Sequence, residues 1–130
     1  MALIVVDASV VIAFLDASDA HHAAAVTTLE ASVSDDLVLP VTAYAELLVA
    51  PARKGGGTVE RVEEALAALT VRLESVTPAI ARAAAVLRAR HRSLRLPDAL
   101  VLATADVLGA AQVLTADRAW LKVSRKVRLI

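Results

Sequence analysis

The sequence of 130 residues contains no cysteine, which excludes disulfide bonds, zinc–thiolate sites and cysteine nucleophiles. Aromatic residues are almost as rare, since Phe14, Tyr44 and Trp120 are the only ones. This scarcity leaves Trp120 as the one candidate for stacking on a nucleic-acid base near the C-terminal end, with a core position as its alternative. Glycine and proline are also few, and only the stretch from Arg53 to Gly57 is expected to form a flexible loop.

Neither sign of charge is in excess, because 14 basic residues balance 14 acidic ones and the formal net charge is zero. Any nucleic-acid contact must therefore come from a local basic patch or through a bound metal ion. The longest runs without a charge, such as 107–116, have about ten residues, whereas a membrane-spanning helix needs about 20. The N-terminus lacks a basic region and is interrupted by Asp7, so no signal peptide is predicted and a cytoplasmic location is expected.

Hydrophobic residues, mostly Ala, Val and Leu, make up 58% of the chain, which suits helices packed on a small Val/Leu sheet in one domain spanning 1–130. Apolar runs predict strands at 3–6, 37–39, 71–76, 112–114 and 127–130. Helices are predicted at 10–15, 21–32, 42–51, 58–70, 78–92 and 97–108, the third capped by Thr42 and ended by Pro51. This alternation predicts an α/β fold with a parallel sheet of about four to five strands and helices on both faces.

Four acidic residues occupy junctions in this pattern: Asp7, Glu46, Asp98 and Asp117. Asp7 and Asp117 follow predicted strands, and Asp98 opens the helix that leads to the strand before Asp117. In an open α/β sheet, ligands bind at the carboxyl ends of the strands. Carboxylates gathered there repel one another unless a cation neutralises them, and oxygen ligands suit Mg²⁺ or Mn²⁺. The sequence therefore predicts a divalent metal site.

Each acid also has an ordinary structural explanation. Asp7 suits a helix N-cap, Asp98 suits compensation of a helix dipole, and Asp117 suits a turn or cap. Glu46 is the only charge between Leu37 and Ala52, which predicts a buried carboxylate in need of a cation. A narrow solvent-exposed face of the helix is the alternative for Glu46.

Other polar residues lie near the predicted site. The hydroxyls of Ser9 and Thr115, each two residues from an acid, could orient the carboxylates or bind a metal-bound water, although capping fits equally well. Basic residues close to the acids are the candidates for binding the phosphates of a substrate, with an ordinary solvated helix face as the alternative. These residues are Arg88, Arg92 and Arg95, which are predicted to share one helical face, and Arg118.

Together these segments resemble a known family, the PIN-domain ribonucleases, and in particular the VapC-type toxins of bacterial toxin–antitoxin pairs. The resemblance is carried by Ile4-Val5-Val6-Asp7-Ala8-Ser9, the lone Glu46, Leu96-Pro97-Asp98-Ala99-Leu100 and Leu114-Thr115-Ala116-Asp117-Arg118. No single motif is specific, but together they extend over nearly the whole chain in the expected order.

The resemblance implies a three-layer α/β/α PIN-like domain with Mg²⁺ or Mn²⁺ held by Asp7, Glu46, Asp98 and Asp117. It also implies metal-dependent cleavage of RNA, neutralisation by a VapB-type antitoxin in a hetero-oligomer, and a homodimer. One alternative is a PIN-like module that binds RNA or protein without cutting. Receiver domains and haloacid-dehalogenase-like phosphatases are weaker alternatives, because Asp7 is followed by Ala8 and Ser9 and lacks the second acid that each requires.

Overall fold

The computed structural model describes residues 1–130 and contains all five predicted strands. The strands are β1 (Leu3–Val6), β2 (Asp36–Pro40), β3 (Arg72–Glu74), β4 (Gln112–Thr115) and β5 (Val127–Leu129). The helices are α1 (Ala8–Leu15), α2 (His22–Ala31), α3 (Val41–Lys54), α4 (Thr58–Ala68), α5 (Pro78–Arg90), α6 (Leu96–Leu108) and the 3₁₀ helix η1 (Arg118–Lys122). None of the helices combines the length and the apolar character that a membrane span requires.

The strands form one fully parallel sheet in the order β3-β2-β1-β4-β5. In the centre, Val5 lies opposite Val38 of β2 and Val113 of β4, and all three residues are fully buried. Continuous apolar strands are expected where both faces of a parallel sheet are covered. The predicted α/β class with a parallel central sheet is therefore confirmed.

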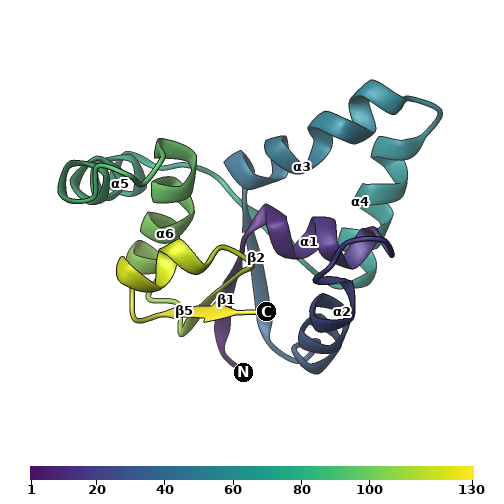
Figure 1. The fold of residues 1–130 in the computed structure, drawn as a ribbon, viewed down its shortest axis with the longest axis horizontal. Coiled ribbons are helices and arrows are strands. Elements are labelled where there is room, and N and C mark those ends of the chain that lie inside the picture. Colours follow the sequence, from purple (N-terminus) through teal and green to yellow (C-terminus); the bar gives the residue numbers. More distant parts are fainter.

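Helices cover both faces because the chain reverses its direction across the sheet after β3. The connections from β1 to β3 proceed towards one edge, and those from β3 to β5 return across the sheet and continue to the other edge. Right-handed crossovers then place α1 to α4 on one face and α5 and α6 on the opposite face, as Figure 1 shows. α6 packs on β1, β2 and β4, and α5 packs on α6. The switch point between β1 and β4 is where open sheets bind ligands.

The core is one cluster of 28 buried hydrophobic residues around the central strands. Trp120 belongs to it with only 1% of its surface exposed. The indole therefore packs in the interior, and Trp120 does not provide a stacking surface for an RNA base.

The boundaries of α3 differ from the prediction. The N-cap is Pro40 and not Thr42, so α3 begins directly after β2, and it continues through Pro51 to Lys54. Pro51 lies in the last turn, where a missing N–H removes only one helical hydrogen bond. Gly55 ends the helix with a φ of 68°, a conformation that glycine adopts without strain.

The start of α5 and the end of α6 follow the sequence signals. Thr77 caps α5 by accepting a hydrogen bond from the Ile80 N–H at 3.2 Å, and Pro78 is the first helical residue. Gly109 follows α6 in the left-handed conformation at φ 65°. α5 ends at Arg90, however, so the next residues are not helical.

Candidate functional site

Asp7 is the most constrained acid of the chain, with 8% of its surface exposed. It occupies the N-cap position of α1 but makes no side-chain capping hydrogen bond, so its predicted alternative role as a cap is wrong. Instead, its Oδ2 accepts hydrogen bonds from the Ser9 hydroxyl at 2.7 Å and from the Thr115 hydroxyl at 3.0 Å. Both side-chain hydrogen bonds go to the same carboxylate oxygen, Oδ2.

The same two hydroxyls join the carboxyl ends of β1 and β4. Ser9 Oγ accepts a hydrogen bond from the Ala116 N–H at 3.1 Å. Thr115 Oγ1 accepts one from the Asp117 N–H, also at 3.1 Å. Each hydroxyl therefore accepts from the backbone after β4 and donates to Asp7, which fixes the orientation of the carboxylate.

Burial raises the pKa of Asp7, and the negative charge of Asp98 raises it further, while the hydrogen bonds from Ser9 and Thr115 oppose the shift. No ion pair involves Asp7. A carboxylate that is buried without a positive partner, at the carboxyl end of a central strand, has the features of a functional group.

Asp98 lies in the first turn of α6, which runs back towards the start of β4 and therefore begins at the carboxyl edge of the sheet. Only 15% of its side chain is exposed, and its place in the first turn is the one that the helix-dipole alternative predicts. Its carboxylate forms an ion pair with Arg95, in which Nε and Nη2 each lie 3.4 Å from a carboxylate oxygen.

Glu46 is exposed, so the prediction of a buried carboxylate is wrong and the solvent-exposed alternative is correct. Its apolar neighbours Ala45 and Val49 are exposed as well, because α3 extends away from the sheet (Figure 1). The pKa of Glu46 is nevertheless raised, first by partial desolvation and then by the charges of Asp7 and Asp98. Glu46 therefore lies within the electrostatic field of these two acids.

Asp117 is exposed and caps η1, since its Oδ1 accepts a hydrogen bond from the Ala119 N–H at 2.9 Å. The capping alternative is therefore correct for one of its oxygens. Its charge acts on Arg95, as do those of Asp98 and Glu46. No group of three or more Asp, Glu or His side chains has the arrangement of a metal site. The charges of Asp7 and Asp98 nevertheless act on Glu46, and that of Asp98 acts on Asp7, so these three acids lie near one another.

The four candidate RNA-binding arginines are all exposed but do not share a helical face. Because α5 ends at Arg90, Arg88 belongs to that helix while Arg92 lies in the following turn and Arg95 is the N-cap of α6. Arg118 is the first residue of η1. The prediction of one basic helical face is therefore wrong, although Arg92 and Arg95 both lie in the segment that leads into α6.

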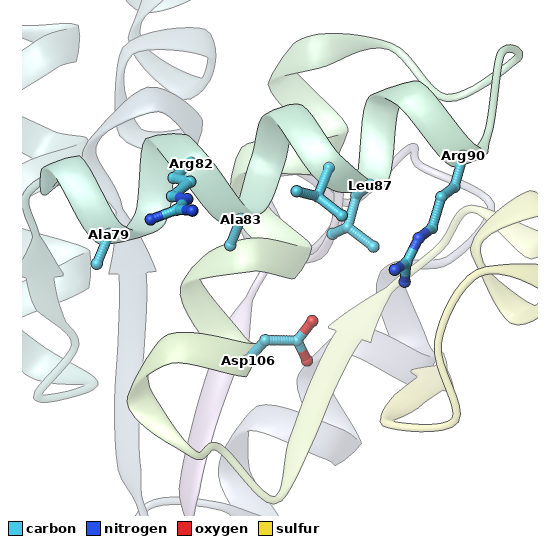
Figure 2. A pocket seen from close by; sticks show the side chains of 7 residues that line it. Ala79, Arg82, Ala83, Leu87, Arg90 and Asp106 are labelled. Carbon is cyan, nitrogen blue, oxygen red and sulfur yellow. The ribbon is translucent and has the colours of Figure 1, made fainter.

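A separate groove of about 470 Å³ lies between α5 and α6. Figure 2 shows Arg82 and Arg90 of α5 extending over it towards the side of Asp106. None of the four candidate acids lines this groove, so it is distinct from the acidic edge.

Two features of the site were not identified from the sequence. The Arg95–Asp98 ion pair could have been found, because the three-residue spacing is typical of pairs at a helix start. Thr42, predicted as a cap, instead has a buried hydroxyl without a hydrogen-bond partner one turn before Glu46. No sequence signal indicates that environment.

A family model for the PIN domain matches residues 4–126. The chain belongs to the PIN domain family. This assignment decides against the receiver and phosphatase alternatives. A search of curated protein sequences gave no significant match.

Solved structures share the fold of this PIN domain. A toxin–antitoxin complex from Klebsiella pneumoniae is 23% identical, with a TM-score of 0.78 and coverage of 98% of this chain and 96% of that one. The Mycobacterium tuberculosis toxin VapC20, described as cleaving the sarcin–ricin loop, is 24% identical, with a TM-score of 0.75 and coverage of 92% and 93%. FitAcB from Neisseria gonorrhoeae is 20% identical, with a TM-score of 0.75 and coverage of 98% and 96%.

Proposed function

We propose that this PIN domain is a Mg²⁺- or Mn²⁺-dependent endoribonuclease that acts as the toxin of a VapBC-type pair. The observation that carries the proposal is the environment of Asp7, a buried carboxylate that two hydroxyls hold at the switch point of a parallel sheet. The structural neighbours described as toxins and toxin–antitoxin complexes support the same activity.

The proposed metal ligands are Asp7, Glu46, Asp98 and Asp117, and their chemistry fits a hard divalent cation. The pKa of Asp7 is raised by burial and by Asp98, so a cation that neutralised both carboxylates would remove a repulsion that the structure contains. Mg²⁺ keeps several waters and uses few direct carboxylate ligands. More distant acids such as Glu46 can therefore act through water.

The side chains present favour attack by water and not by a protein nucleophile. Ser9 donates its hydroxyl proton to Asp7 and no histidine contacts it, so it lacks a general base of the serine-hydrolase type. A bound divalent ion would lower the pKa of a water molecule and stabilise charge on the scissile phosphate. The carboxylates orient these groups, and Ser9 and Thr115 keep Asp7 in position.

Positive charge around the start of α6 would bring the RNA backbone to this acidic edge. Arg92 and Arg118 are exposed and form no ion pair, so their guanidinium groups are free to bind phosphate. Arg88 extends the same surface along α5. Contacts of this kind position the backbone without reading its sequence.

Cleavage of labelled single-stranded RNA by the purified protein tests the activity. We expect cleavage that depends on Mn²⁺ and falls at least about a hundredfold in Asp7→Asn and in Asp98→Asn, because each change removes a ligand charge. Asp106→Asn on the same helix is the matched control and should cut like wild type. Equal cleavage by all four proteins would contradict the proposal, and RNA binding without cleavage would identify a non-cleaving module.

The proposed partners are a VapB-type antitoxin and a second copy of this chain, in the cytoplasm. Co-expression with a VapB-type antitoxin should give a hetero-oligomer without RNase activity. Sedimentation of the isolated protein should give the mass of a dimer.

A further inference from the structure

Arg95 is the only cation that forms an ion pair with one of the four proposed metal ligands. Its Nε and Nη2 lie 3.4 Å from the two carboxylate oxygens of Asp98. Asp98, through its hydrogen bonds and its charge, is the main cause of the raised pKa of the guanidinium, and the charges of Glu46 and Asp117 add to it. One side chain thus lies in the field of three of the four proposed metal ligands.

The backbone of Arg95 is fixed while its side chain is free to move. As the N-cap of α6, Arg95 accepts the hydrogen bond from the Ala99 N–H through its carbonyl oxygen at 3.0 Å. Leu94 before it is buried, and Pro97 follows in the first turn. The Arg95 side chain, by contrast, is 71% exposed. Its two contacts with Asp98 are long for hydrogen bonds, so a competing cation could displace them.

We propose that Arg95 is the resident counter-ion of the acidic site, which a divalent metal ion displaces and which then binds the phosphate backbone of the substrate. The inference rests on the proposed function, because it takes the acids as metal ligands. Two cations cannot share the carboxylates of Asp98 without repelling each other. Metal binding therefore weakens the ion pair between Arg95 and Asp98. The guanidinium then binds the other strong anion that reaches this edge, the RNA phosphate.

Calorimetric titration of metal-free protein with Mn²⁺ tests the competition directly. At low ionic strength we expect Arg95→Gln to bind Mn²⁺ about two- to fivefold more tightly than wild type, the range typical of an exposed ion pair. Arg95→Lys keeps the charge and should remain near the wild-type affinity. Arg82→Gln removes a positive charge from the α5–α6 groove and should leave the affinity unchanged. The gain should shrink at about 0.5 M salt, because screening already weakens the exposed pair.

The second half of the proposal predicts a weaker substrate interaction. At saturating Mn²⁺, Arg95→Gln should raise KM for RNA severalfold with little change in kcat. Unaltered or weaker Mn²⁺ affinity in Arg95→Gln would overturn the counter-ion role of Arg95 but would not contradict the proposed metal site. Absence of Mn²⁺ binding in every protein, wild type included, would overturn both this inference and the proposed function.

Discussion

Asp7 is a carboxylate that the fold buries with hydroxyl partners but with no positive charge. Ser9 and Thr115 satisfy one of its oxygens, and yet burial still raises its pKa. The charged form is therefore held at a cost in stability, which a bound cation would remove.

Asp7→Asn should stabilise the metal-free protein at pH 7. The amide oxygen can still accept both hydroxyl hydrogen bonds, while the buried charge and its repulsion by Asp98 disappear. We expect a gain of roughly 1 kcal/mol, or about 3–5 °C in Tm. Mn²⁺ should raise the Tm of wild type but not that of the variant. A less stable variant in metal-free buffer would contradict this account of Asp7.

The difference between these two proteins should depend on pH. Because the folded-state pKa of Asp7 is raised above its ordinary value of 3.8, its contribution to stability is full below that value and is lost as the pH rises through the raised pKa. Asn at this position does not titrate. The advantage of Asp7→Asn should therefore grow from pH 4 to pH 7 in urea denaturation, whereas a constant difference would contradict the raised pKa.

Thr115→Val should destabilise the protein and lower its activity. Thr115 is fully buried, and its hydroxyl donates to Asp7 and accepts from the Asp117 N–H. Loss of both bonds should cost about 1–3 kcal/mol. The matched control is Thr104→Val, because the equally buried Thr104 hydroxyl donates only to the Leu100 carbonyl within its own helix. Denaturation curves that show the same loss for both variants would contradict the proposed role of Thr115.

At the scale of elements, the strands and their order of alternation with helices could be predicted because the signal is local. Apolar runs such as Leu3–Val6 end directly at an acid, and parallel strands carry such acids to one edge. The exposure of Glu46 could not be predicted, because it depends on how far α3 extends from the sheet. The prediction that Arg88, Arg92 and Arg95 share a helical face failed for a related reason. Their spacing suits a helix, but α5 ends at Arg90, where the chain turns into α6.

The cap of α5 offers a prediction for this element. Thr77→Ala should destabilise the protein by about 1 kcal/mol, because the Ile80 N–H loses its acceptor. Thr77→Ser keeps the hydroxyl and should stay within a few tenths of a kcal/mol of wild type in chemical denaturation. A large loss with Ser, or none with Ala, would show that the cap does not determine the stability of α5.

At the scale of the whole molecule, the fold separates a neutral chain into an acidic edge and a basic approach to it. Formal net charge is zero, yet Asp7 and Asp117 follow β1 and β4 at the carboxyl edge of the sheet, and Asp98 opens α6 beside the exposed Arg95. The topology creates this pattern, since β1 lies between β2 and β4 at the switch point. Asp7, Glu46 and Asp98 come from three separate segments, and the topology brings them near enough for the charges of Asp7 and Asp98 to raise the pKa of Glu46.

Anomalous diffraction from crystals grown with Mn²⁺ tests the central claim most directly, because it locates the metal ion independently of activity. The account predicts an anomalous peak in contact with Asp7 at the carboxyl end of β1, with Asp98 as a second ligand, and its loss in Asp7→Asn crystals. Well-ordered crystals that show no peak at this edge, or peaks only at acids remote from Asp7, would contradict it.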